Sequence, residues 1–528
     1  MTTREHDVDW LLVSFPVTAG IAAVILAIMI NALATPRKAD PREPPLLKPT
    51  IPFVGHAIGF IRHQARYHYT LQRTSQQPIV TLPMLTGKLY AIWEPTLISA
   101  GLKNRHLSTK PQMEAVISPL FKVSKPTAKL MKGGLSDYLT DRIMFHALPA
   151  SFAKETQQKF IDAALSEISK YFVALSSGAS RQQEIVPNVW LFIRDVVAKA
   201  TTPPLYGKDH DPFTHDPTLE QSFWDFNESL LALSIDILSN IFARAGNIGR
   251  EKMAKAIAPY YHAHLEDHPS ASALIRNRAK ELRNAGVPVD DIARFEALLP
   301  FAAMINTVPT LFWFFAHVFT RPDLVQQLRK EIETGILSRT GSKAKLVISA
   351  AVLQEKTPLL WSCYKETLRL TIHQAVTRTV MQDTTITSAA TGQTYFLQKG
   401  SVVQMSIGVA HNLPEFWGKD SEEFKADRFV GLTKSEGKAL KAAHQPYGGG
   451  LHLCPGRHFA LAEMMAVMTT LIVGFEVESL DGRAWRGPER GTASIVDAAT
   501  KPKNEGKGFG AQIRSREGWE DVTWEYCF

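Results

Sequence analysis

The sequence predicts a mainly α-helical fold with minor β structure, in one large domain behind a single transmembrane helix. Apolar residues recur at helical spacing over long stretches, such as residues 221–245 and 323–336. Strand-like segments are short and few, at residues 78–85, 384–390 and 401–410. No internal repeat with a period of about 20 to 50 residues divides the chain.

An uncharged segment near the N-terminus predicts the transmembrane helix. Residues 11–34 carry no charged side chain. At 1.5 Å per residue this helix would be roughly 36 Å long, enough to cross a bilayer core of about 30 Å. Basic residues follow the segment, at positions 37, 38, 42 and 48. The positive-inside rule therefore predicts that residues 1–10 lie in the lumen and that the bulk of the protein faces the cytosol.

Two alternatives to a transmembrane helix exist for this segment. A cleaved signal peptide would use Ala32-Leu33-Ala34 as its small-residue cleavage site. The apolar run is longer than a signal-peptide core, however, and the residues before it are acidic rather than basic. A buried helix of a soluble domain is the other alternative, and the length of the run disfavours it.

Composition and charge narrow the class of protein further. Six prolines make residues 35–52 a stiff, extended connector, which leaves residues 53–528 as the large domain. Three scattered cysteines exclude a disulfide framework and a zinc cluster, and they favour a reducing compartment. The formal charge of +8 is spread along the chain without a basic stripe, so nucleic acid is not an expected partner. The charge suits a membrane surface or an acidic partner protein, and solubility alone explains it equally well.

Cys454 lies in an unusual loop, PYGGGLHLCPGRHFA, at residues 446–460. Consecutive glycines permit a tight turn and a close approach of the backbone to a flat ligand. Pro455 suits the first position of a helix. Amide groups at that helix start would favour a thiolate able to bind a metal. A buried, inert cysteine is the alternative when the residue is considered alone.

The spacing Tyr447-x-x-Gly450-x-x-x-Cys454-x-Gly456 resembles the haem-binding loop of the cytochrome P450 family. The resemblance implies the cytochrome P450 fold and a haem b cofactor whose iron is bound by the Cys454 thiolate. It also implies that Tyr447, Gly448, Gly450 and Gly456 line the cofactor. The family usually has Phe at the position of Tyr447.

Further matches to the family place more residues around the haem. The resemblance implies that His452 contacts one haem propionate and that Arg378, in a β-strand, contacts the other. It implies that Glu366 and Arg369, in the motif Glu-x-x-Arg, form a structural triad with Arg428. The chain has no recognisable Trp-x-x-x-Arg on an earlier helix, where many members of the family bind a propionate.

The segment from Phe295 to Val318 is a long apolar helix that two prolines, Pro300 and Pro309, interrupt. An interior proline leaves a carbonyl four residues earlier without its partner. The family carries an acid followed by threonine on this helix, and here the pair is Asn306-Thr307. Both are predicted catalytic residues: Thr307 would hydrogen-bond dioxygen and help to deliver protons, whereas Asn306 cannot ionise and leaves proton supply to water or another group.

The pattern Asn-Thr-x-Pro followed by Phe-Trp resembles the branch that contains sterol 7α-hydroxylases and prostacyclin synthase. The resemblance implies a monooxygenase anchored in the endoplasmic reticulum membrane that oxidises a lipophilic substrate, such as a sterol, a terpenoid or a secondary metabolite, in a fungal biosynthetic pathway. Electrons would come from NADPH through NADPH–cytochrome P450 reductase, with cytochrome b5 as an optional second donor. Substrate selection would involve residues near Phe301 and Ile372 and the loop at 113–134.

Two other functions stay open at this point. A redox-neutral haem isomerase or dehydratase of the prostacyclin-synthase type would need neither NADPH nor a reductase. A haem-binding sensor would not turn over any substrate. Retention of Thr307 favours the monooxygenase over both.

Overall fold

The computed structural model describes residues 40–49, 55–84, 87–131, 134, 154–177, 184–235, 239–494 and 497–528. The predicted lumenal residues 1–10, the predicted transmembrane helix at 11–34 and both ends of the predicted connector, residues 35–39 and 50–52, lie outside the described residues. Those three boundaries therefore stay predictions.

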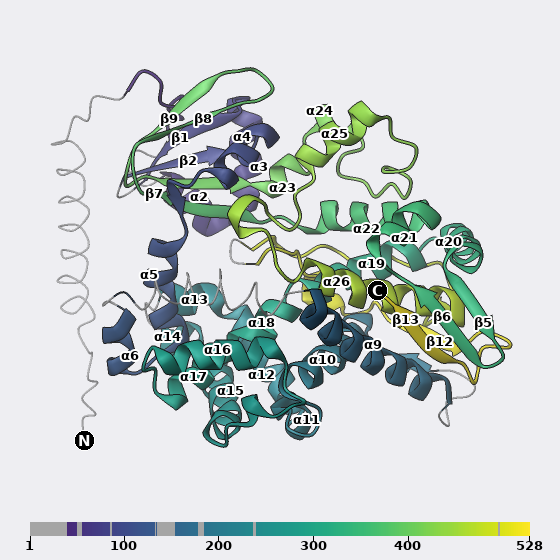
Figure 1. Cartoon of the computed structure of the whole chain (residues 1–528). Coiled ribbons are helices and arrows are strands. Elements are labelled where there is room, and N and C mark those ends of the chain that lie inside the picture. The colour runs from purple at the N-terminus through teal and green to yellow at the C-terminus, as the bar shows by residue number, and fades with distance from the viewer. Residues whose placement is uncertain are drawn as a thin grey trace, which may run out of the picture.

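Helices make up most of the described chain, as the periodicity predicts, and together with the strands they form one large domain (Figure 1). The α-helices are α2 (Gly55–His63), α3 (Arg66–Ser75), α4 (Pro95–Lys103), α5 (Lys110–Phe121), α6 (Lys125–Leu130), α9 (Lys154–Ser177), α10 (Val189–Tyr206), α11 (Pro212–His215), α12 (Thr218–Glu228), α13 (Leu230–Ile235), α14 (Ser239–Phe242), α15 (Arg244–His262), α16 (Ala273–Asn284), α17 (Val289–Glu296), α18 (Leu298–Met304), α19 (Thr307–Phe319), α20 (Pro322–Gly335), α21 (Ala350–Lys356), α22 (Pro358–Thr371), α23 (Ile407–Ala410), α24 (Pro414–Trp417), α25 (Lys434–Ala443) and α26 (Arg457–Gly474). Short 3₁₀ helices are η3 (Leu265–Asp267), η4 (Gly450–His452) and η5 (Lys503–Gly506).

The strands form small sheets at the edges of the helical body. The largest has the order β1 (Ile79–Pro83), β2 (Lys88–Ile92), β10 (Val402–Ser406), β7 (Ala375–Val380) and β3 (Leu107–Ser108), and only the pair β2–β10 is parallel. Two three-stranded sheets have the orders β11 (Phe475–Ser479), β12 (Ala511–Ser515), β4 (Glu184–Val186) and β13 (Thr523–Cys527), β6 (Lys343–Val347), β5 (Leu337–Thr340). Strands β8 (Thr384–Thr387) and β9 (Thr394–Leu397) form a hairpin.

The five-stranded sheet is buried on both faces. Alternate residues of β1 and β2 point to opposite sides, so Ile79 and Tyr90 pack with α4 on one face. Val80 and Leu89 pack on the other face against Phe60 of α2 and other apolar residues. Figure 1 shows this sheet, with α2, α3 and α4 around it, at the upper left of the molecule. Apolar packing on both faces of β1, β2 and β10 makes the sheet a firm support for the neighbouring strand β7, which carries Arg378.

Helix α19 lies in the centre of the helical body, between α22 and α26 (Figure 1). All but one of its residues are buried, which is typical of a helix that is apolar on every side. Within the described part of the chain, the segment Ala302–Phe319 is long and apolar enough to cross a membrane, but 78% of it is buried inside the protein. This segment, which contains the end of α18 and all of α19, therefore belongs to the core of the fold.

The structure divides two segments that the periodicity predicts as single helices. Residues 295–318 contain the end of α17, all of α18 and nearly all of α19, with a turn at residues 305 and 306. Pro300 and Pro309 are each the third residue of a helix, where the missing N–H has no intrahelical partner to lose. The prolines thus mark helix starts rather than kinks. Residues 221–245 likewise contain parts of more than one helix.

Helix α26 carries a buried acid in its middle. Glu463 is 1% exposed, and its Oε1 accepts a hydrogen bond of 2.9 Å from Thr201 Oγ1 on α10. Its Oε2 has no hydrogen-bond partner among the described residues. Burial raises the pKa of Glu463 to about 8, so the carboxyl group is largely protonated at neutral pH.

We expect Glu463→Gln to remove a pH dependence of stability. In the unfolded chain Glu463 ionises near its ordinary pKa of 4.5, whereas the folded protein keeps the proton up to about 8. The contribution of Glu463 to the free energy of unfolding is therefore fully present below pH 4.5. It is lost as the pH rises to about 8, and the loss is at most a few kcal/mol. The Tm of the natural chain should fall relative to that of Glu463→Gln across pH 5 to 8, because all other groups are shared. Parallel Tm curves would contradict the protonated state.

Candidate functional site

Cys454 lies between η4 and the start of α26, and the loop around it points backbone amides at the sulfur. The N–H groups of Gly456 and Arg457 hydrogen-bond to the thiol, and the Cys454 N–H donates to the Tyr447 carbonyl at 3.1 Å. Helix α26 begins at Arg457, so the expected placement of Pro455 at the first helical position is wrong. Pro455 and Gly456 instead form the turn that brings these amides to the sulfur.

The ionisation of Cys454 is a balance between burial and those amides. Burial raises the pKa of the thiol, while the two N–H groups and the Arg457 guanidinium lower it, and burial has the larger effect. The helix start therefore does not by itself produce the predicted thiolate. A bound metal cation would, because coordination deprotonates a thiol outright. The two amides and the Arg457 charge favour the ionised sulfur, which is the form that binds a metal.

Glycines allow the cysteine loop to lie directly against α4. Gly448 and Gly450 have φ angles of +71° and +63°, which favour glycine. A Cβ atom on Gly450 would lie 2.0 Å from the carbonyl oxygen of Leu102, near the end of α4. Any side chain at position 450 would therefore force the loop and α4 apart.

Tyr447 has a hydrogen-bond partner that sequence reasoning missed. Its hydroxyl lies 2.6 Å from the hydroxyl of Tyr364 on α22. Burial raises the pKa of both phenols, so both stay neutral. The hydroxyl that distinguishes Tyr447 from the usual phenylalanine is therefore satisfied. The contact joins residues 83 positions apart, and no local sequence signal could have identified it.

The structure brings Arg378 and His452 near each other. Arg378 on β7 is 7% exposed, and its guanidinium donates to the carbonyl of Thr377 at 2.9 Å. Among the described residues it forms no ion pair, and burial lowers its pKa to about 10. Burial and the charge of Arg378 together lower the pKa of His452. A buried cation without a counter-charge is costly, and an anionic ligand at this place would remove that cost.

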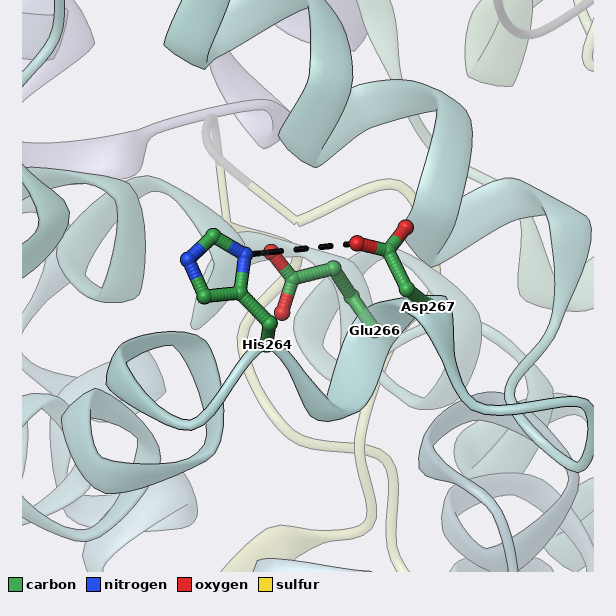
Figure 2. Close-up of side chains that lie close together, drawn as sticks. All are labelled: His264, Glu266 and Asp267. Carbon is green, nitrogen blue, oxygen red and sulfur yellow. Dashed lines mark ion pairs between the residues drawn. The ribbon is translucent and has the colours of Figure 1, made fainter.

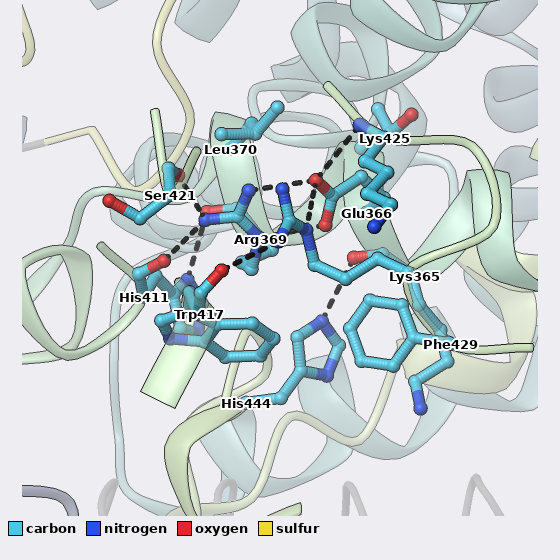
Figure 3. Close-up of polar contacts among 12 residues, drawn as sticks. Lys365, Glu366, Arg369, Leu370, His411, Trp417, Ser421, Lys425, Phe429 and His444 are labelled. Atoms are coloured by element: carbon cyan, nitrogen blue, oxygen red, sulfur yellow. Dashed lines mark hydrogen bonds and ion pairs between the residues drawn. The ribbon is translucent and has the colours of Figure 1, made fainter. Parts of the chain in front are cut away.

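Glu366, Arg369 and Arg428 form the predicted ion cluster. Figure 3 shows Glu366 and Arg369 with the residues around them. Arg369 Nε donates to Glu366 Oε2 at 2.7 Å, and Arg428 Nε donates to Oε1 at 2.8 Å. Both Glu366 and Arg369 are 0% exposed. Arg369 Nη2 donates to Glu366 Oε1 at 2.7 Å, and Arg369 Nη1 donates to the carbonyls of His411 and Ser421, each at 2.6 Å. One carboxylate thus joins α22 to the segment that precedes the cysteine loop.

We expect Glu366→Ala to destabilise the protein by roughly 3–5 kcal/mol, because the buried Arg369 loses its counter-charge and Arg428 keeps only its ion pair with Asp420. The measurements are thermal unfolding and the fraction of purified protein that retains its cofactor. Glu415→Ala, at an exposed glutamate of α24, is the matched control and should change neither quantity. Equal behaviour of the two variants would contradict a supporting role for Glu366.

The break between α18 and α19 presents the two residues predicted to be catalytic. Thr307 is the first residue of α19 and is 5% exposed, and its Oγ1 donates to the Ala303 carbonyl at 2.9 Å. Asn306 lies in the turn, and its Oδ1 accepts a hydrogen bond from the Ala499 N–H at 3.2 Å. The threonine hydroxyl thus bridges the break, while the asparagine side chain holds a distant segment.

A second cluster of possible metal ligands lies outside this site. His264, Glu266 and Asp267 gather at the turn after α15, with His264 and Asp267 on either side of Glu266 (Figure 2). Arg283 already pairs with Glu266 at 2.6 Å, and the other two side chains are exposed. We therefore interpret the cluster as an ion-pair network that closes the turn.

The cysteine loop and its surroundings fit a haem. Cys454 offers a sulfur for the iron, Arg378 and His452 offer cationic or donor groups for the propionates, and Gly448 and Gly450 permit the tight turn that precedes the cysteine. The assignment of each residue to the cofactor stays a prediction, because it rests on the chemistry of the donor set.

Comparisons with known proteins give a consistent picture. The sequence model of the cytochrome P450 family matches residues 44–503. A cytochrome P450 monooxygenase of Gibberella zeae is 34% identical over 99% of this chain and 98% of its own length. Cytochrome P450 monooxygenase nodJ of Hypoxylon pulicicidum is 27% identical over 96% of both chains. The human 7-alpha-hydroxycholest-4-en-3-one 12-alpha-hydroxylase is 23% identical over 87% of this chain and 92% of its own.

A solved structure supports the fold independently. The retinoic acid-bound cyanobacterial CYP120A1 aligns with a TM-score of 0.65 over 90% of this chain and 100% of that chain, at 18% sequence identity. This likeness concerns the arrangement of helices and sheets alone.

Proposed function

This chain belongs to the cytochrome P450 family, and on that premise we propose that it is a membrane-anchored enzyme that oxidises a lipophilic substrate of the sterol, terpenoid or secondary-metabolite type. The family and the named relatives make it a haem-thiolate monooxygenase that uses O2. Its cofactor is haem b, and its electrons come from a redox partner. The anchor, the substrate class and the identity of the partner are the proposed parts.

The observation that carries the proposal is the cysteine loop, which presents the Cys454 sulfur to hydrogen bonds from the Gly456 and Arg457 amides. We assign Cys454 as the iron ligand, with Arg378 and His452 binding the propionates. Thiolate-bound haem supplies the activation of dioxygen when the cofactor is in place. The protein's contribution is to orient the cofactor and to exclude water from it. The triad of Glu366, Arg369 and Arg428 supports the loop from behind.

Thr307 is proposed to hold and deliver protons on the oxygen side of the site. Its hydroxyl can accept one proton while it donates another, which suits a relay from water to a reacting oxygen. In the structure the hydroxyl hydrogen points to the Ala303 carbonyl at the helix break. Because Asn306 cannot ionise, the protons in this proposal come from water.

The substrate class is proposed from relatives and from the character of α19. The relatives include fungal monooxygenases and an enzyme named as a sterol 12-alpha-hydroxylase. Helix α19, which begins with Thr307, is apolar along nearly its whole length. These observations support a lipophilic substrate in a fungal biosynthetic pathway. We propose NADPH–cytochrome P450 reductase as the electron donor, with cytochrome b5 as an optional second donor, at the endoplasmic reticulum membrane.

We expect Cys454→Ser to abolish the spectral signature of sulfur ligation. The dithionite-reduced natural chain bubbled with carbon monoxide should give a red-shifted Soret band, because a thiolate donates strongly to the iron. Cys363→Ser, at a buried cysteine far from the loop in sequence, is the control and should keep the band. An unshifted band in properly loaded natural protein would refute sulfur ligation.

We expect Thr307→Ala to lower product formed per NADPH consumed by about tenfold or more, because a proton-transfer group is lost. The substrate for this assay comes from comparing metabolites with and without the gene. Thr310→Ala, one turn along α19, is the matched control. Product formation that continues without NADPH and reductase would instead favour the redox-neutral isomerase or dehydratase.

A further inference from the structure

Residues 497–501, which we call the strap, contact several elements that are far apart in the sequence. The Ala498 carbonyl accepts from the His373 N–H at 2.8 Å, and the Thr500 N–H donates to the Thr371 carbonyl at 3.0 Å, at the end of α22. The Trp313 side chain of α19 donates to the Thr500 carbonyl at 2.7 Å. The strap therefore lies between the last residues of α22 and the central helix.

Both ends of the strap are attached to α12. Asn227 is 2% exposed, and its Nδ2 donates to Asp497 Oδ1 at 3.0 Å. Lys501 donates to Asn227 Oδ1 and forms an ion pair of 3.6 Å with Asp497 Oδ2. The side-chain amide of Asn227 thus binds both ends of the strap: its nitrogen donates to Asp497, and its oxygen accepts from Lys501.

The middle of the strap is attached to the helix break. Ala499 is 2% exposed, and its N–H reaches Asn306 Oδ1 in the turn between α18 and α19. Without that acceptor the buried N–H would be left unpaired, which costs free energy. An amide also makes this contact without placing a charge two residues from Asp497 on the strap.

We propose that Asn306 is a positioning residue, which acts through the Ala499 N–H to hold the strap between α12 and the helix break and so sets the shape of the substrate pocket beside Thr307. The assignment gives a reason for asparagine at the position where the family carries an acid. Selection of bulky ligands then depends on the two asparagines that hold the strap. The inference rests on the proposed function only in placing the pocket beside Thr307.

The test compares Asn306→Ala, Asn306→Asp and Asn227→Ala in the full-length, haem-loaded protein. Hydrogen exchange followed by mass spectrometry reports on peptides that cover 497–505. Spectral titrations use two haem-binding probes, imidazole as a small azole and clotrimazole as a bulky one. Gln327→Ala, at an exposed amide of α20, is the matched control.

We expect Asn306→Ala to speed exchange of the strap amides about tenfold and to weaken clotrimazole binding about fivefold, with imidazole binding unchanged within about twofold. Asn306→Asp keeps an acceptor oxygen but adds a negative charge near Asp497, so strap exchange and clotrimazole binding should change in the same direction as in Asn306→Ala but by a smaller factor. Asn227→Ala should loosen the strap and weaken clotrimazole binding in the same way, and it provides the test if Asn306→Ala does not retain haem.

Unchanged strap exchange in both alanine variants would overturn the proposal. Equal weakening of the two azoles would also overturn it, because the effect would then lie at the haem rather than in the pocket wall. Neither readout involves turnover. Failure of the proposed monooxygenase activity would therefore appear separately, as intact strap exchange without product formation.

Discussion

The carboxylate of Glu366 is the contact on which the arrangement of the site depends. It neutralises Arg369 on its own helix and Arg428 on a segment 62 residues further along the chain. A buried ion cluster of this kind contributes little net stability compared with apolar packing, but it tolerates no missing member. The cluster instead fixes the path of the neighbouring backbone. Arg369 also donates to the carbonyls of His411 and Ser421, and Arg428 donates to the carbonyl of Trp417. The segment before the cysteine loop therefore has one defined path.

The helix break between α18 and α19 provides a second constraint. The turn at residues 305 and 306 frees backbone groups that a continuous helix would use. The Thr307 hydroxyl donates a hydrogen bond to one of these groups, the Ala303 carbonyl. The Asn306 side chain accepts a hydrogen bond from the buried N–H of Ala499. A break that is satisfied in this way costs little and places polar groups inside an apolar helix. Such placement is what a site for a lipophilic substrate and a polar reaction requires.

The sequence predicts the fold class because helical periodicity is a local property. It predicts the cysteine loop because glycine, cysteine and aromatic residues at fixed spacing follow one backbone geometry. Pro300 and Pro309 were harder to interpret, since an apolar run looks the same whether a proline bends a helix or begins a new one. Tyr364 and Ala499 were beyond sequence reasoning. Each contacts its partner across 83 or 193 residues, and only tertiary packing brings them together.

The contact between Gly450 and the Leu102 carbonyl has a consequence for protein engineering. The position of the loop that holds the proposed iron ligand is set by its contact with the end of α4, about 350 residues earlier in the chain. A chimera that exchanges only the loop between two members of the family would pair it with a foreign helix end. Exchanges that carry the end of α4 together with the loop preserve the fit, so these two remote segments form one transplantable unit.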